Sequence, residues 1–210
     1  MSVDGEAAFQ EKANVSRETL ARFRQYHEIL LKWNQKINLI SAGQTPEAIW
    51  TRHFLDSVQL FDLAANKPQD WVDIGAGGGF PGLVNAILAA EKAPDMRFAL
   101  VEADARKAAF LQTVNVKLKL SVEVINERVE NLEPLRADIL SARALAPLPR
   151  LLPYAERHLR PDGMALFMKG ARYRQEVEEA LENWKFRLQE YPSITNGEAV
   201  ILKLGEIRRV

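Results

Sequence analysis

A run of glycines that follows a short apolar segment constrains the fold of this chain more than any other feature. Residues 73–82 read DIGAGGGFPG, so half of them are glycine. Glycine adopts positive φ without strain and lets a ligand lie directly against the backbone. Pro81 occupies a position that proline favours at the start of a helix, where free N–H groups can bind a ligand. The segment therefore predicts a strand, a ligand-binding loop and a helix, in that order.

From Trp71 onward, short apolar segments alternate with segments of helical periodicity. The expected strands are 71–74, 98–102, 122–125, 138–141, 164–168, 186–191 and 199–204, and the expected helices are 82–91, 106–118, 148–159 and 172–183. This alternation indicates βαβ units in a mostly parallel sheet with helices on both faces. Only residues 192–198 separate the last two strands, too few for a helical crossover, so this pair should be antiparallel at the sheet edge. The sequence predicts an α/β fold with about seven strands.

Residues 1–66 predict a helical extension, and residues 67–210 predict the α/β domain. Residues 1–14 show no periodicity, so we expect them to be frayed. Ser16 is placed to cap a helix whose apolar positions recur at spacings of three or four. Those positions are Leu20, Phe23, Tyr26, Leu30, Trp33 and Ile37. A second helix is expected over 46–65, and the turn-forming residues 66–68 close the extension.

Composition excludes several classes of protein. Of the 210 residues, 47% are hydrophobic and 27% are charged, which is ordinary globular usage. The chain has no cysteine and only three scattered histidines, so we expect no disulfide, no thiol catalysis and no metal site. The first residues lack the apolar core of a signal peptide, and no segment is apolar enough to cross a membrane. We expect a cytoplasmic monomer. Because 28 basic residues balance 28 acidic ones, nucleic-acid binding would have to rest on a local patch.

Two ligand-binding patterns fit the glycine loop. Read as Gly77-x-Gly79-x-x-Gly82, the loop matches the dinucleotide fingerprint, which would indicate an NAD(P)-dependent oxidoreductase. Read from Asp73, it is D-x-G-x-G-x-G, the pattern of S-adenosylmethionine (AdoMet) methyltransferases. A turn that serves packing alone is the third interpretation.

A second cofactor contact is expected at the end of the next strand. An acid that binds the ribose hydroxyls lies about 20 residues beyond such a loop. Glu102 ends the apolar segment 98–102 and follows Gly79 by 23 residues, so Glu102 is the candidate. Asp104 competes for the same role, and a solvated strand-end carboxylate is the structural alternative.

Four further motifs make the chain similar to one protein family. They are WNQKINL at 33–39, RHFLDS at 52–57, RALAPL at 143–148 and Lys169-Gly170. With the glycine loop and the helical extension, they resemble the RsmG (GidB) family of bacterial rRNA methyltransferases over nearly the whole chain. The resemblance implies a Rossmann-like class I AdoMet-dependent methyltransferase fold. It also implies methylation of N7 of one guanine in 16S rRNA, at position 527 in the 530 loop.

The resemblance also implies binding partners and site residues. AdoMet would be the cofactor and S-adenosylhomocysteine the product, and 16S rRNA or the small ribosomal subunit would be the macromolecular partner. The loop pattern assigns Asp73, Gly77 and Gly79 to cofactor binding. The resemblance adds Gly75, Phe80, Val129, Glu130 and Arg143. Ala142 separates Ser141 from Arg143, where many members have Ser directly before Arg, so Ser141 receives no role.

The implied chemistry needs little from acids and bases. Guanine N7 carries a free lone pair, so no general base is expected, and proximity with orientation can supply roughly 7–11 kcal/mol of the barrier. Arg143 ends a strand where substrate and cofactor would be positioned. Asn38 and His53 are placed near the cofactor mouth, although a structural cluster of His53 with Asp56 is an equal alternative. Trp33 is expected to be a core anchor.

A basic segment follows the fourth expected strand. Its candidate RNA contacts are Arg150, Arg157, Arg160, Lys169, Arg172 and Arg174. Such residues meet RNA phosphates, but they can equally form a solvated helix face. A non-catalytic RNA-binding module on the same fold is therefore a further alternative to the methyltransferase and the oxidoreductase.

Overall fold

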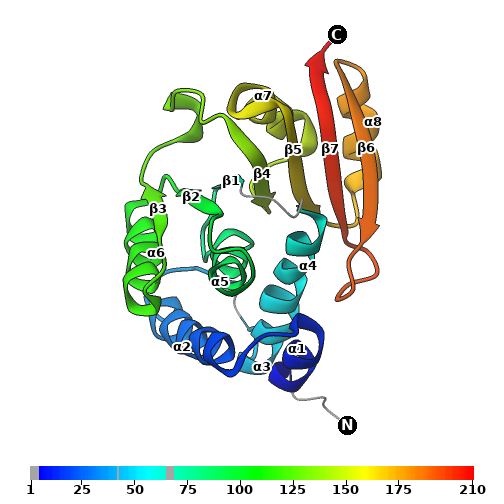
Figure 1. The fold of residues 1–210 in the computed structure, drawn as a ribbon. Coiled ribbons are helices and arrows are strands. Elements are labelled where there is room, and N and C mark those ends of the chain that lie inside the picture. Colours follow the sequence, from blue (N-terminus) through cyan, green and yellow to red (C-terminus); the bar gives the residue numbers. More distant parts are fainter. Residues whose placement is uncertain (1–4, 42, 65–68) are drawn as a thin grey trace.

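The computed structural model describes residues 5–41, 43–64 and 69–210. The expected division of the chain at residues 66 and 67, and the turn at 66–68, lie outside these ranges. The described residues form one seven-stranded sheet in the order β3-β2-β1-β4-β5-β7-β6 (Figure 1). The strands are β1 Asp70–Ile74, β2 Arg97–Val101, β3 Val122–Ile125, β4 Ala137–Arg143, β5 Leu159–Lys169, β6 Trp184–Pro192 and β7 Val200–Arg209.

The strand directions confirm the predicted α/β sheet. β1 to β5 pair in parallel, and β7 pairs antiparallel with both β5 and β6. The last two strands are therefore antiparallel as expected, with β6 at the edge. β5 begins five residues earlier than expected, because Pro161, Asp162 and Gly163 suggest a turn but form the start of the strand. Here the sheet bulges, with Ala137 opposite Leu159 and Ile139 opposite Met164.

Helices cover both faces of the sheet, as the alternating pattern predicts. They are α1 Gly5–Ala13, α2 Arg17–Asn34, α3 Pro46–Ile49, α4 Asp56–Leu63, α5 Gly82–Lys92, α6 Ala105–Leu118, α7 Leu148–His158 and α8 Tyr173–Leu181. Adjacent strand residues point to opposite faces, so Trp71 lies in one buried cluster and Val72 in the other. The first cluster joins α1, α2, α4, α5 and α6 to the sheet, and the second joins α7 and α8 to it (Figure 1).

The expectation of a frayed N-terminus is wrong for residues 5–13, which form α1. Phe9 is fully buried, and its ring centroid lies 4.7 Å from that of Phe23 and 5.5 Å from that of Trp50. A single large apolar residue produces no periodicity, so this helix depends on a tertiary contact that the local pattern does not reveal. Residues 1–4 lie outside the described ranges.

The two expected helices of the extension are present. Ser16 caps α2, since its Oγ accepts a hydrogen bond from the N–H of Thr19 at 3.1 Å. Trp33 packs against the first buried cluster with its ring 5.8 Å from Phe110, which confirms its role as a core anchor. The second helix is continuous from α3 to α4, but residues Trp50–Leu55 between them form a π-helix, η1. The apolar spacing of the sequence does not distinguish this wider turn from α-helix.

Candidate active site

The glycine loop connects β1 to α5 and is anchored by the buried side chain of Asp73. Asp73 is 1% exposed, and its Oδ1 accepts a hydrogen bond from Ser141 Oγ at 2.6 Å. Its Oδ2 accepts from the N–H of Gly82 at 3.1 Å, at the far end of the loop. Burial raises the pKa of Asp73 to about 7, against the lowering effect of these two hydrogen bonds. Asp73 thus lies beneath the loop and fixes its two ends, and Ser141 fixes Asp73.

The inner side of the loop is closed by the helical extension. Tyr26, on α2, is fully buried and donates a hydrogen bond to the carbonyl oxygen of Gly78. The Phe80 ring stacks between Tyr26, at a centroid distance of 5.8 Å, and His53, at 4.7 Å. The extension and the loop therefore form one packed unit.

The outer side of the loop is open at Gly77. Gly75, Gly77 and Gly79 have φ of +66°, +53° and +88°, conformations that favour glycine. A Cβ atom at Gly77 would meet only the carbonyl oxygen of Gly75, at 3.7 Å. A Cβ atom at Gly75 would instead lie 2.6 Å from the side chain of Leu145. Gly77 is thus the point where a ligand can lie against bare backbone.

Glu102 adjoins this open point. Its Oε2 accepts from the N–H of Gly77 and its Oε1 from the N–H of Asp104, each at 2.8 Å. Asp104 caps α6 and accepts hydrogen bonds from the N–H groups of Arg106 and Lys107, so its carboxylate is engaged elsewhere. The position of Glu102 against the loop favours it over Asp104 as the second cofactor contact.

Residues that follow β3 lie at the same carboxyl edge of the sheet as Gly77 and Glu102. Asn126 Nδ2 donates to the carbonyl oxygen of Glu102 at 2.8 Å, a contact that the sequence interpretation missed. Val129 is buried and begins a 3-10 turn, η2 Val129–Asn131. Glu130 is exposed and accepts a hydrogen bond from Tyr154 at 2.6 Å, which lowers the pKa of Glu130. The candidates at β1, β2 and β3 therefore lie along the same carboxyl edge of the sheet.

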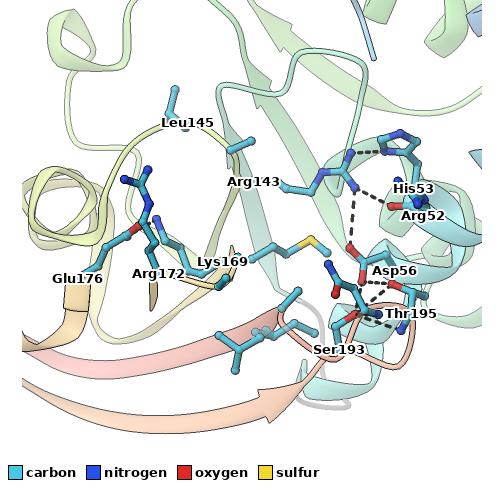
Figure 2. Close-up of a pocket in the computed structure, with 18 of the residues that line it drawn as sticks. Arg52, His53, Asp56, Arg143, Leu145, Lys169, Arg172, Glu176, Ser193 and Thr195 are labelled. Atoms are coloured by element: carbon cyan, nitrogen blue, oxygen red, sulfur yellow. Dashed lines mark hydrogen bonds and ion pairs between the residues drawn. The ribbon is translucent and has the colours of Figure 1, made fainter. Parts of the chain in front are cut away.

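Arg143, at the end of β4, links the glycine loop to η1. Its guanidinium lies 5.0 Å above the Phe80 ring, donates to the carbonyl oxygen of Arg52 at 3.2 Å and lies 3.9 Å from Asp56 (Figure 2). It also donates to Nδ1 of His53. Burial lowers the pKa of Arg143, while Asp56 opposes that effect.

His53 is a neutral acceptor in this cluster. Burial, with the nearby charges of Arg143 and Arg52, lowers the pKa of His53 to about 3. Because an arginine can only donate, Nδ1 must carry a lone pair and Nε2 must carry the proton. Nε2 lies 2.5 Å from Oε1 of Gln44, which accepts that proton's hydrogen bond. The geometry thus fixes both the tautomer of His53 and the orientation of the Gln44 amide.

A cavity of about 800 Å³ opens beside Arg143, at the carboxyl ends of β4 and β5. Figure 2 shows Lys169, Arg172 and Glu176 on one side of it and His53, Asp56, Ser193 and Thr195 on the other. Asp56 Oδ1 accepts hydrogen bonds from Ser193 at 2.7 Å and Thr195 at 2.8 Å, which ties α4 to the loop between β6 and β7. The size of the cavity and its charged walls suit a polar ligand larger than a single base.

The structure brings together only part of the predicted RNA-binding set. Lys169 and Arg172 line the cavity. Arg157 donates to the carbonyl oxygen of Leu132, and Arg160 forms ion pairs with Asp70 and Asp138 at the opposite edge of the sheet.

The path of α7 explains this separation. α7 starts near the cavity edge and spans eleven residues, about 16 Å at 1.5 Å per residue, so its two ends lie far apart. Arg150 is exposed in its first turn. Arg174 is exposed on α8 and lies 4.9 Å above the Tyr173 ring. The basic segment is continuous in sequence but not in space.

The sequence interpretation missed several residues that line the cavity, whereas the predicted Asn38 is not part of the lining. Gln44, Arg52, Ser193, Thr195 and Asn196 line it and gave no sequence signal, apart from Arg52 within RHFLDS. Asn38 is exposed in the turn after α2, which Asn34 holds by accepting from the N–H groups of Leu39 and Ile40. That turn approaches Gly78, since a Cβ atom there would lie 3.0 Å from the carbonyl oxygen of Leu39.

The described residues show neither a metal site nor a membrane-spanning helix. They contain no group of three or more His, Asp or Glu side chains arranged to hold a metal ion. None of the helices in this part of the chain has the length and hydropathy to cross a membrane.

Comparison with known proteins matches the sequence of this chain to one family. The family model for rRNA small subunit methyltransferase G matches residues 19–202. The ribosomal RNA small subunit methyltransferase G of Ruegeria pomeroyi is 49% identical over 197 residues, which cover 94% of this chain and 96% of the relative. The protein of the same name from Cereibacter sphaeroides is 50% identical over 200 residues, covering 95% and 96%.

Solved structures of lower identity share the fold. A ribosomal protein L11 methylase from Lactobacillus delbrueckii superposes with a TM-score of 0.57 at 18% identity, covering 73% of this chain and 76% of that one. M. jannaschii TYW2 in complex with AdoMet gives 0.52 at 14% identity, covering 74% and 77%. The fold is that of class I AdoMet-dependent methyltransferases, as predicted. The family match over nearly the whole sequence shows that this chain belongs to the rRNA small subunit methyltransferase G family.

Proposed function

We propose that this protein transfers a methyl group from AdoMet to N7 of a guanine in 16S rRNA, at position 527 in the 530 loop. The family match over residues 19–202 carries the proposal for rRNA methylation. The choice of guanine, N7 and position rests on the resemblance of the sequence motifs to that family. The site of action would be the bacterial cytoplasm, and the substrate 16S rRNA or a small-subunit particle.

The residues at the carboxyl edge fit AdoMet. Gly77 offers bare backbone at positive φ, and Glu102 lies against it with a carboxylate suited to ribose hydroxyls. Gly75, Phe80, Val129 and Glu130 would complete the cradle. When bound, AdoMet supplies an electrophilic methyl group on a sulfonium that is a good leaving group.

The chain's own contribution would be placement of the two reactants. Arg143 is held in one position by His53, Arg52 and Asp56, between the glycine loop and the cavity. The N7 lone pair forms the new bond to carbon while the carbon–sulfur electron pair goes to sulfur, so no proton has to move. This agrees with a site whose histidine is neutral and already engaged at both ring nitrogens. Orientation is then the main source of rate enhancement.

The decisive experiment is methyl transfer from labelled AdoMet to small subunits that lack the modification, followed by mapping of the product. We expect one 7-methylguanine at position 527. Gly77→Val is the matched inactive control, because a valine at φ of +53° strains the loop and its side chain fills the open point. Labelling at another position would refute the proposed target. NAD(P)H binding without methyl transfer would favour the oxidoreductase, and RNA binding with neither would favour the non-catalytic module.

A further inference from the structure

Two carboxylates, those of Asp56 and Glu176, line the cavity beside Arg143. They differ in how many of their oxygens already accept hydrogen bonds. Asp56 Oδ1 accepts from Ser193, Thr195 and Gln59, while its Oδ2 faces Arg143. Every oxygen of Asp56 therefore already has a partner within the protein.

Glu176 leaves one oxygen free for a ligand. Its Oε2 accepts from the N–H of Leu148 at 2.8 Å and pairs with Lys169 Nζ at 2.5 Å. Among the residues that the structure describes, none donates a hydrogen bond to its Oε1. The Glu176 side chain is 18% exposed and lines the cavity opposite His53 and Asp56 (Figure 2). The carboxylate is thus held in place by two donors and presents an unused acceptor on the cavity wall.

A fixed carboxylate acceptor discriminates between bases. The Watson–Crick edge of guanine carries two donors, N1–H and the N2 amino group, whereas N1 of adenine is an acceptor. Enzymes that modify a base extrude it into a pocket and recognise that edge by hydrogen bonds. A guanine whose N7 faces the glycine loop carries its Watson–Crick edge on the far side of the ring, and in this cavity that edge would face the walls. Resting on the function proposed above, we propose that Glu176 accepts hydrogen bonds from N1–H and N2–H of the target guanine.

The same contact would strengthen during the reaction. A bond from N7 to carbon places positive charge on the purine, which makes N1–H a stronger donor to the carboxylate. An interaction that is stronger in the transition state than in the ground state raises kcat and not only affinity. Lys169 pairs with Oε2 of Glu176 at 2.5 Å and holds the carboxylate in place, so Lys169 would be a positioning residue.

The alternative role for Glu176 is purely structural. Through Leu148, and with Lys169 bound to the carbonyl oxygen of Ala146 at 2.8 Å, it braces the loop after β4. A brace would affect every substrate equally, whereas a base contact would not. This difference defines the test.

The test pairs a change in the protein with a change in the RNA. Small-subunit RNA with inosine at the target position keeps N7 and loses only the N2 amino group. We expect the wild type to methylate guanine with a kcat/KM at least about tenfold above that for inosine, the equivalent of one hydrogen bond to a charged group. Glu176→Ala and Glu176→Gln should slow the guanine substrate and bring the ratio close to one. Glu176→Gln keeps an oxygen for Leu148 and turns a donor toward the base, so it retains the brace but not the base contact.

The controls separate this inference from the proposed function. Glu178→Gln, exposed on the same helix, should leave both rates and their ratio unchanged. Variants of Glu176 that lower both rates with the wild-type ratio intact would overturn the base contact and leave the brace. A wild type that methylates neither RNA would instead refute the proposed function.

Discussion

Individual side chains at the glycine loop divide between those buried beneath the loop and those at its open side. Asp73 is buried under it, with both oxygens engaged by Gly82 and Ser141. Glu102 lies at the open side, against Gly77. Their positions follow from the strands that carry them, since both residues lie near carboxyl ends of neighbouring parallel strands. Two acids that look alike in sequence thus have different expected phenotypes.

Glu102→Ala should weaken AdoMet binding by about 1–3 kcal/mol, the usual consequence of leaving buried hydrogen-bonding groups without partners. Isothermal calorimetry with AdoMet measures it directly. Asp104→Ala is the matched control: it removes the cap of α6 and should lower the free energy of unfolding by about 1 kcal/mol with little change in AdoMet affinity. The opposite assignment of the two effects would identify Asp104 as the cofactor acid.

His53 predicts a pH dependence of stability. The pKa of His53 is about 3 in the folded chain against 6.5 for an unperturbed histidine. Between these values the unfolded chain binds a proton that the folded chain excludes, so stability falls as pH decreases through this window. The difference in unfolding free energy between the wild type and His53→Gln should shrink by about 2 kcal/mol from pH 7 to pH 5, at about 1.4 kcal/mol per pH unit.

Urea denaturation at several pH values checks this prediction. Asp73, whose pKa burial raises to about 7, gives the opposite slope but titrates in both proteins and cancels from the difference. A difference that stays constant with pH would mean that His53 titrates normally and that its contact with Arg143 is weaker than the structure indicates.

At the scale of elements, the π-helix η1 sets the direction of two site residues. Its wider turn lies between α3 and α4 and carries Arg52 and His53 toward Arg143. Such turns are uncommon and often occur at functional sites. α2 also contacts this site, through the hydrogen bond of Tyr26 to Gly78 and the stacking of Tyr26 on Phe80.

Tyr26→Phe should weaken AdoMet binding several-fold while the fold persists. The ring keeps its packing, but the buried carbonyl oxygen of Gly78 loses its donor, an effect of about 1–3 kcal/mol shared between stability and loop geometry. Burial raises the pKa of Tyr26, so the phenol remains a donor at working pH. Tyr191→Phe removes a hydroxyl from an exposed contact and is the control. Equal AdoMet affinity in both variants would show that α2 does not position the loop.

At the scale of the whole molecule, the two edges of the sheet have different charge arrangements. The carboxyl edge presents Arg52 and Arg172, both exposed at the cavity, with no ion pair for either among the described residues. At the other edge, Arg97 and Arg160 are paired with Asp70, and Arg160 also with Asp138. RNA phosphates should therefore bind along the cavity edge.

Salt titration of RNA binding tests whether the RNA binds at the cavity edge of the sheet. Arg52→Ala/Arg172→Ala should lower affinity and flatten the slope of log K against log salt by roughly 1.4–1.8, at about 0.7–0.9 for each lost phosphate contact. Arg157→Ala/Arg160→Ala, at the opposite edge, should leave the slope unchanged. A larger change from the second pair would place the RNA on the other side of the molecule.

The sequence by itself determined most of the elements and the glycine loop. The spacing of apolar residues and the run of glycines depend on interactions within a few residues, so they predicted all seven strands, the helices on both faces and the capping of α2 by Ser16. The loop pattern and Glu102 also follow from chain order, because parallel strands bring their carboxyl ends to one edge.

Only the tertiary structure decided which distant side chains meet. The contact of Phe9 with Trp50, the cluster of Arg143 with His53 and Asp56, and the loop at Ser193 each join segments with no local signal for one another. The same is true of the basic segment, which α7 divides between opposite edges of the sheet. Local periodicity reports which face of an element is buried, whereas the partners of a polar side chain depend on how whole elements pack together.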